Sequence, residues 1–216
     1  MAFADALIEA GGFVGPPIFF GNQGATIPSV VAFWVVFYVW IGSELWLGYR
    51  LRRRPPGDGA DQDSGSKFWV IASVWASVAI GMGLAFAFPS AAILSGRIVV
   101  FIAGLLLMIA GMALRWYSIR VLGSSFTCEV VTRPGQEVVQ AGPYRWVRHP
   151  SYTGGLVTVL GVLLCCCNVV SLAALIVAVM GYANRIRVEE RALAKDLGDP
   201  YREYMQRTKR LIPFVV

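Results

Sequence analysis

The sequence predicts an all-α integral membrane protein, and three observations predict it. Hydrophobic residues make up 56% of the 216 residues and charged residues only 15%, against about 25% charged residues in an ordinary soluble domain. The apolar residues gather in runs of about 20, the length that crosses a bilayer as a helix. Arginines stand beside these runs, as is typical of cytoplasmic loops. We expect a single domain, 1–216, with five transmembrane segments.

The N-terminal part, 1–97, contains two of these runs, at 27–47 and 68–88. The loop between the runs is rich in arginine, glycine and aspartate, which places it in the cytoplasm. Glu44 lies near the end of the first run, and a carboxylate at that depth is a functional candidate. The favoured alternative is that Glu44 reaches the interface or pairs with Arg50.

The C-terminal part, 98–216, begins with a third span at 98–117 and continues with a polar segment at 121–150. Residues 152–183 are then almost wholly apolar, and one straight helix of that length would measure about 48 Å. A bilayer core is only about 30 Å thick. Because Cys167-Asn168 interrupts the run, we expect two short helices that form a hairpin.

The hairpin also explains the charge of the tail, which carries eight lysines and arginines after Tyr182. A hairpin keeps these charges in the cytoplasm, with the N-terminus outside, as the positive-inside rule requires. In a bacterium, the protein would lie in the inner membrane. We expect tail helices at 184–197 and 201–207, and short extended pieces at 127–132 and 137–140 in the cytosolic loop.

Several kinds of site are not supported. The net charge of +6 could indicate nucleic acid, but the basic residues border apolar runs and no aromatic stacking module accompanies them. Consecutive helical positions point in different directions, so the cysteines at 165–167 cannot chelate a metal together. His149 is the sole histidine, which also argues against a metal. A glycine-rich dinucleotide fingerprint is absent.

Two polar clusters carry the chemistry, at 142–152 and at 185–190. In the second cluster, which we expect on a helix, Arg185 and Glu189 are i,i+4 neighbours, and Arg187 and Glu190 are i,i+3 neighbours. Surface ion pairs and a juxtamembrane anchor are the simplest interpretations. The hairpin brings both clusters to one membrane face, where together they form a charged, aromatic pocket. Such a pocket suits a polar, partly cationic cofactor beside a lipid-like substrate.

These clusters resemble motifs of the isoprenylcysteine carboxyl methyltransferase family. The Arg-His-Pro-x-Tyr-x-Gly motif is matched by Arg148-His149-Pro150-Ser151-Tyr152-Thr153-Gly154. The family's Gly-x-Tyr pattern before this motif is matched by Gly142-Pro143-Tyr144. Its Arg-x-x-x-Glu-Glu motif is matched by Arg185 with Glu189-Glu190. Its closing pattern is matched by Gly198, Tyr201 and Tyr204, followed by Ile212-Pro213-Phe214. The resemblance covers about 100–214.

The resemblance implies a cytosolic-side pocket for S-adenosylmethionine. It implies cofactor contacts from Val139, Gly142, Tyr144, His149, Tyr152, Glu189 and Glu190. It implies that Arg148 and Arg185 handle the carboxylate of a lipophilic or prenylated substrate, and that 98–216 is the catalytic half. A carboxylate with a pKa of about 3.5 is ionised at neutral pH and needs no general base.

Other functions stay open. A phospholipid N-methyltransferase would need a base such as His149 or Glu189 to remove a proton from the acceptor amine, and small thiols are further acceptors. A membrane NADPH-dependent sterol or enone reductase resembles this family in its C-terminal half. A transporter or assembly factor is disfavoured, since Glu44 is the one clear intramembrane charge and no repeat is visible. The oligomeric state is not predicted.

Overall fold

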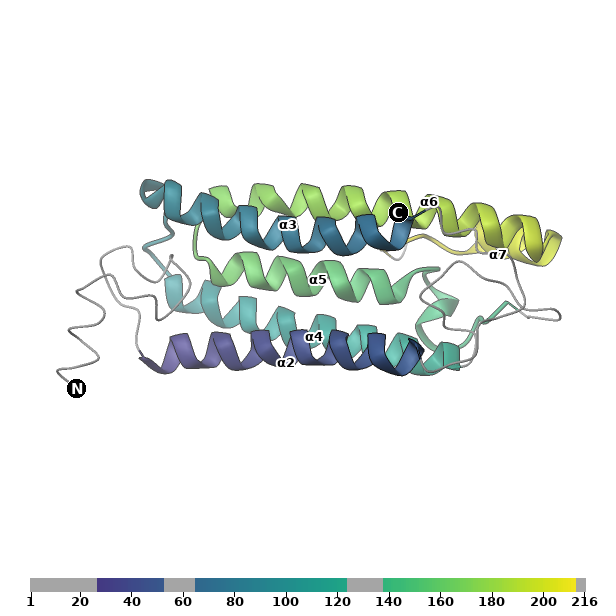
Figure 1. Ribbon diagram of the computed structural model, residues 1–216, viewed down its shortest axis with the longest axis horizontal. Helices are drawn as coiled ribbons and strands as arrows, with labels where there is room; N and C mark the ends of the chain where they lie inside the picture. Colours follow the sequence, from purple (N-terminus) through teal and green to yellow (C-terminus); the bar gives the residue numbers. More distant parts are fainter. Residues whose placement is uncertain (1–26, 53–64, 124–137, 213–216) are drawn as a thin grey trace.

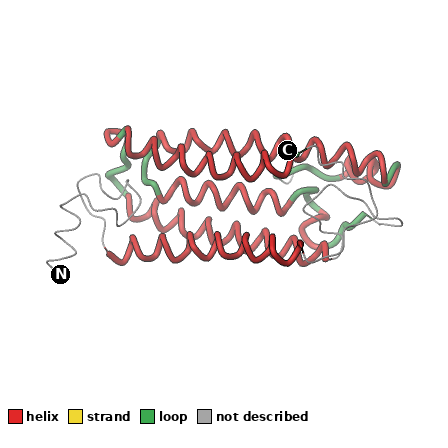
Figure 2. Tube along the Cα trace, viewed as in Figure 1, coloured by secondary structure: helices red, strands yellow, loops and turns green. Residues whose placement is uncertain are grey.

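The computed structural model describes residues 27–52, 65–123 and 138–212, which form helices that run along one common axis (Figure 1). The α-helices are α2 (Ile27–Arg52), α3 (Ser66–Ala87), α4 (Arg97–Leu122), α5 (Pro150–Cys165), α6 (Leu175–Asp196) and α7 (Asp199–Arg207). Three short 3-10 helices connect them: η2 (Pro89–Ala91), η4 (Gly142–Arg145) and η5 (Val170–Ala174). The described residues contain no strand, and the described loops between the helices, green in Figure 2, are short.

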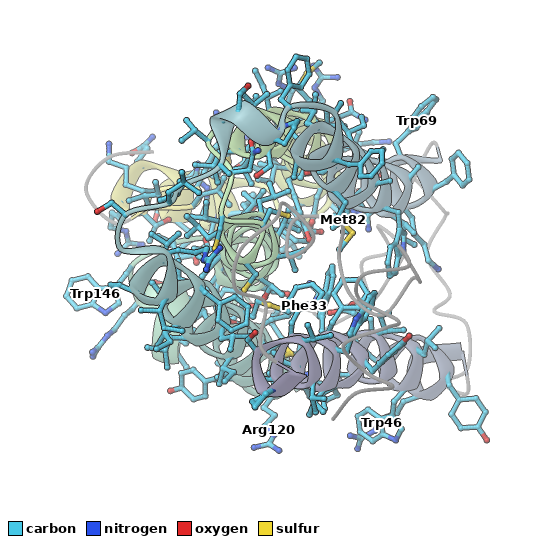
Figure 3. All side chains as sticks on the ribbon, turned by 90° about the vertical axis from the view of Figure 1, so that its left-hand side faces the viewer. Phe33, Trp46, Trp69, Met82, Arg120 and Trp146 are labelled. Carbon is cyan, nitrogen blue, oxygen red and sulfur yellow. The ribbon has the colours of Figure 1, made fainter. Side chains whose placement is uncertain are left out.

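Four helices of the described part are long and apolar enough to cross a membrane. They cover Pro28–Arg50, Ser66–Ala87, Arg97–Leu122 and Val170–Asp196. The helix α5 is also apolar but has only 16 residues, or about 24 Å of length. Viewed along the bundle, Phe33 and Met82 point inward, while Trp46, Trp69 and Trp146 point outward (Figure 3). Large outward apolar side chains are what lipid contact permits, so a multi-pass, all-helical membrane protein is confirmed.

The observed helices differ from the predicted ones mainly at their ends. Both α2 and α4 continue beyond the predicted 47 and 117 into polar residues, ending at Arg52 and Leu122. The expected boundary between a span and a separate tail helix at 184–197 is wrong, because α6 is continuous from Leu175 to Asp196. The sequence explains this, since no glycine or proline interrupts the chain between 182 and 196.

The predicted break at Cys167-Asn168 is confirmed. Cys167 adopts a positive φ of 47°, and the Asn168 side chain donates to the Phe88 carbonyl at 2.9 Å while it accepts from the Val170 amide at 2.9 Å. The chain reverses here, so α5 and α6 run in opposite directions (Figure 1). Of the predicted extended pieces, 127–132 lies outside the described residues and 138–140 has no regular secondary structure.

Glycines allow α4 and α5 to pack with their backbones in contact. A Cβ placed on Gly161 would lie 2.6 Å from the Gly104 carbonyl oxygen and 2.6 Å from the Met108 amide nitrogen. One on Gly111 would similarly meet the Gly154 carbonyl oxygen at 2.6 Å. Small residues at helix contacts are the usual way in which membrane helices associate, since lipid leaves no hydrophobic drive between them. This interface fixes α5 against α4.

An ion pair joins α2 to α4 within the span. Arg115 donates from Nε and Nη2 to the two carboxylate oxygens of Glu44, at 2.6 and 2.9 Å. Glu44 therefore pairs with Arg115, and the expected pairing with Arg50 is wrong. The Arg50 guanidinium instead lies over the Trp46 ring, 5.1 Å from its centroid. Arg115 also donates to Ser151 Oγ at 3.1 Å, which connects the pair to the first turn of α5.

The glycine interface yields a stability prediction. We expect Gly161→Ala to lower the free energy of unfolding by about 1–3 kcal/mol, because the new methyl meets backbone that cannot move aside. Gly83→Ala is the matched control, since nothing lies within 4 Å of its Cβ position. Thermal unfolding in detergent measures both. Equal melting temperatures for the two variants would contradict the close backbone contact.

Candidate active site

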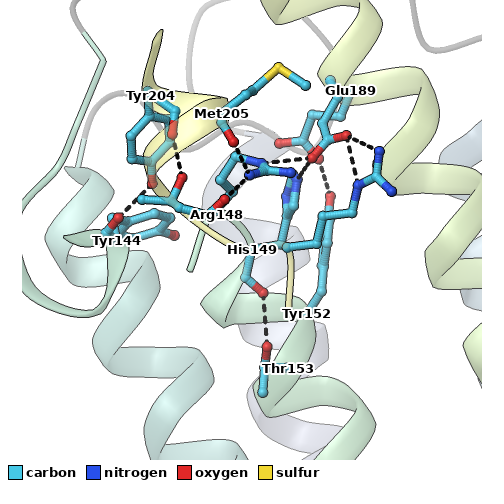
Figure 4. Close-up of polar contacts among 11 residues, drawn as sticks. Tyr144, Arg148, His149, Tyr152, Thr153, Glu189, Tyr204 and Met205 are labelled. Carbon is cyan, nitrogen blue, oxygen red and sulfur yellow. Dashed lines mark hydrogen bonds and ion pairs between the residues drawn. The ribbon is translucent and has the colours of Figure 1, made fainter. Parts of the chain in front are cut away.

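The polar residues of both predicted clusters meet at one end of the bundle. The N-terminus of α5 and the C-terminal part of α6 lie there because the two helices are antiparallel, and α7 lies beside them (Figure 1). The loop before α5 and the segment after α7 complete the site. Figure 4 shows the network that these elements share.

The carboxylate of Glu190 lies at the centre of this network and is 4% exposed. It accepts from Arg148 Nε at 2.9 Å and from Arg210 Nε at 3.0 Å. His149 Nε2 lies 3.3 Å from the same oxygen that Arg148 contacts. The interpretation of Glu190 as half of a surface ion pair with Arg187 is wrong, because Glu190 is buried and its partners come from the loop and the tail.

Arg148 fastens the C-terminal segment to the loop. Its Nη1 donates to the carbonyl oxygens of Met205, at 3.0 Å, and of Thr208. The backbones of the two segments also pair in parallel, with the Arg148 amide donating to the Lys209 carbonyl at 2.7 Å and the His149 amide to the Arg210 carbonyl at 3.0 Å. Arg148 is thus a structural part of the site as well as a candidate ligand-binding group.

Tyr152 connects the other guanidinium to the other carboxylate. Its hydroxyl donates to Glu189 Oε2 at 2.6 Å and accepts from Arg185 Nε at 3.3 Å. Its ring stacks on the imidazole of His149, with centroids 5.4 Å apart and planes 9° from parallel. Arg185 is 4% exposed, and its Nη1 donates to Ser66 Oγ of α3 at 2.6 Å. The site therefore draws on α3, α5 and α6.

Two buried tyrosines join the loop to α7. The Tyr204 hydroxyl donates to the Tyr144 carbonyl oxygen at 2.6 Å. Burial raises the pKa of Tyr204 to about 12, although the nearby Arg148 guanidinium and the Thr208 hydroxyl act in the opposite direction. Burial also raises the pKa of Tyr144, and the Glu189 carboxylate adds to this effect. Both phenols are therefore protonated and neutral at pH 7, and Tyr204 remains a hydrogen-bond donor.

The structure unites most of the predicted site residues. Direct contacts connect Arg148, His149 and Glu190 on one side and Tyr152, Arg185 and Glu189 on the other, with the His149–Tyr152 stack between them. Val139 lies in the irregular segment before η4 and is half-buried. Gly142 faces α4, since a Cβ there would lie 3.1 Å from Tyr117 Oη and 3.1 Å from Val121 Cγ2.

Ser66, Arg115 and Arg210 were not predicted as site residues. Arg210 was counted only among the eight basic residues of the tail. In the described ranges no group of three or more His, Cys, Asp or Glu side chains is placed to hold a metal ion.

The fold and the site define a multi-pass helical membrane protein with a buried network of arginine, histidine and carboxylate side chains at one end of the bundle. Residues 104–195 match the profile of the isoprenylcysteine carboxyl methyltransferase (ICMT) family. This match confirms the resemblance that the motifs of the chain predicted.

Curated relatives carry the name protein-S-isoprenylcysteine O-methyltransferase. Form B from Arabidopsis thaliana is 38% identical over 115 residues, which are 52% of this chain and 58% of the relative. The Saccharomyces cerevisiae protein is 34% identical over 117 residues, 53% of this chain and 49% of that protein. The Homo sapiens protein is 30% identical over 117 residues, 53% of this chain and 41% of that protein. The chain thus matches about half the length of these relatives.

A solved structure has a similar fold over part of its length. It is that of the eukaryotic intramembrane Ras methyltransferase ICMT, with a TM-score of 0.53 and 28% sequence identity. The match covers 70% of this chain and 53% of that one. The similarity therefore extends beyond the segment that the family profile matches.

The position of Arg148 predicts a large effect on stability. We expect Arg148→Met to lower the free energy of unfolding by about 3–5 kcal/mol, because it leaves the buried Glu190 carboxylate short of a partner. Hydrogen exchange should also rise in residues 205–210, because the Met205 and Thr208 carbonyls lose their donor. Arg187→Met on the exposed face of α6 is the control. Unchanged melting and exchange in Arg148→Met would contradict its role in fastening the tail.

Proposed function

We propose that the chain is an S-adenosylmethionine-dependent methyltransferase that acts at the membrane surface. Its acceptor is lipophilic, and the reaction is carboxyl O-methylation of an isoprenylcysteine-like substrate. The observation that carries the proposal is the buried network around Glu190 and Tyr152, in which two arginines and two glutamates of the family-matched segment meet. The names of the relatives support the choice of reaction.

The residues present suit this cofactor. S-adenosylmethionine supplies an activated methyl group on a positively charged sulfur. We propose that it contacts Val139, Gly142, Tyr144, His149, Tyr152, Glu189 and Glu190. The Glu190 carboxylate contacts Arg148 and His149 through Oε1, and it contacts both Nε and Nη2 of Arg210 through Oε2. Because the Arg210 side chain is 49% exposed, we propose that a ligand hydroxyl or amine takes the place of one Arg210 contact. The aromatic side chains nearby suit an adenine ring.

Arg148 and Arg185 are the residues that we propose to hold the acceptor carboxylate. A guanidinium binds a carboxylate through two parallel hydrogen bonds, and its charge favours the ionised nucleophile. The task of the protein is then to place that oxygen in line with the methyl group and to remove water from it. Both side chains are held by neighbours, Arg148 by Glu190 and Arg185 by Tyr152, so their positions are set before the acceptor arrives.

We also propose the topology that this function requires. α5 and α6 form the hairpin, α5 crosses the membrane in addition to the four long helices, which makes five crossings, and the end of the bundle that carries the site faces the cytoplasm. The arginines at this end, among them Arg50 and Arg120, support the orientation. The short α5 is compatible with a crossing because neighbouring helices surround it and local thinning of the bilayer accommodates a short segment.

Cofactor binding is tested with S-adenosylhomocysteine, titrated calorimetrically into the detergent-purified protein. We expect saturable binding that Glu190→Gln weakens about 10-fold, since it removes one charged partner. Glu203→Gln on the exposed face of α7 is the matched control and should bind as the wild type does. A folded wild-type protein that binds NADPH and not S-adenosylhomocysteine would falsify the proposal.

The acceptor side is tested with a farnesylated cysteine analogue and labelled S-adenosylmethionine. We expect Arg185→Ala to lose transfer by about 100-fold or more, because an oriented charged partner of the acceptor is gone. Its affinity for S-adenosylhomocysteine should remain close to that of the wild type. Arg187→Ala, on the exposed face of the same helix, should transfer normally. Normal transfer by Arg185→Ala would remove that residue from its proposed role.

A further inference from the structure

Three contacts of α3, one with the last residue of η5 and two with α6 directly after it, define an antiparallel seam of small and polar residues. At one end, Ser77 Oγ donates to the Ala174 carbonyl oxygen at 2.8 Å. In the middle, Gly181 leaves no room for a Cβ, since one would overlap Ser73 Oγ. At the end near the site, Ser66 Oγ accepts from Arg185 Nη1 at 2.6 Å. The residue numbers rise on one helix as they fall on the other, so the two helices are in register along the whole seam.

The register places Ser66 rigidly against the site. Ser66 is the first residue of α3 and is only 1% exposed. Its position follows from the packing of two helices of 22 residues each. A helix-to-helix contact of this kind holds a partner group more firmly than a loop does. The Ser66 hydroxyl therefore has a fixed position, from which it holds the Arg185 guanidinium.

Two helices together determine where the Arg185 guanidinium lies. Nη1 is held by Ser66 of α3, and Nε is held by the Tyr152 hydroxyl of α5, at 3.3 Å. An arginine side chain has several rotatable bonds, and ordering it costs rotamer entropy. The hydrogen bonds that two rigid helices make to two of its nitrogens compensate for this loss of entropy during folding. The guanidinium is then ordered before a ligand binds.

We infer that Ser66 is a positioning residue for the reaction, which acts by fixing the Arg185 guanidinium for the acceptor carboxylate. The inference rests on the proposed function and goes beyond it. Ser66 lies outside the 104–195 segment that the family profile matches, so the N-terminal part of the chain completes the site. The hydroxyl itself touches neither methyl donor nor acceptor.

The test uses the full chain in detergent, with the farnesylated cysteine analogue as acceptor. We expect Ser66→Ala to lower kcat/KM for the acceptor about 10-fold, the size of one lost hydrogen bond to a charged group. The affinity for S-adenosylhomocysteine and the melting temperature should stay near the wild-type values. Ser73→Ala is the matched control, because its hydroxyl donates to the Val70 carbonyl of its own helix, and its acceptor kinetics should not change.

A double-mutant cycle separates positioning from a general structural effect. Arg185→Lys shortens the side chain and removes the Nη1 contact, so adding Ser66→Ala to it should cause no further loss. Additive losses would overturn the inference, as would a Ser66→Ala protein whose acceptor kinetics equal the wild type. A parallel fall of melting temperature, cofactor affinity and transfer would overturn it too, because Ser66 would then be merely structural. A wild-type protein without transfer would instead remove the proposed function on which the inference rests.

Discussion

The organisation of the site depends on one buried negative charge, the carboxylate of Glu190. A charge in a protein interior costs several kcal/mol unless partners surround it. Its partners are Arg148 and His149 from the loop before α5 and Arg210 from the segment after α7. Three segments that are distant in the sequence must therefore come together at the end of α6. Arg148 strengthens the assembly, because it also bonds the backbone of the tail.

Hydropathy was sufficient to predict the four long apolar helices and the break at Cys167-Asn168, since both depend on local composition. The motif resemblance was sufficient to predict Arg148, His149, Tyr152 and the two glutamates as neighbours. Contacts between helices could not be predicted, because no spacing encodes them. The partner of Glu44 is 71 residues away in Arg115, and that of Ser66 is 119 residues away in Arg185. For Glu44 the nearer Arg50 was the reasonable choice, and it was wrong.

The part of the chain before residue 98 does more than anchor the protein. Glu44 neutralises Arg115 within the span, where an unpaired guanidinium would be costly. Arg115 in turn reaches Ser151 Oγ, the residue directly before Tyr152. A second connection runs from α3 through Ser66. Both N-terminal helices thus contact arginines of the matched segment. The connection through Arg115 ends at Ser151, next to Tyr152 in the chain, and the connection through Arg185 ends in a hydrogen bond to Tyr152 itself.

The short length of α5 determines how far from the end of the bundle the site residues lie. With 26 residues, α4 measures about 39 Å, against about 24 Å for the 16 residues of α5. The glycine contacts hold the two side by side, with Gly154 of α5 against Arg115 of α4, so the end of α4 reaches beyond the N-terminus of α5. His149 and Tyr152, at that N-terminus, therefore lie below the end of α4. Under the proposed orientation these two residues lie nearer to the acyl chains than that end does. The lipid-modified acceptor of the proposed function would then reach the site while its hydrocarbon tail stayed in the leaflet, with no step that extracts the tail into water.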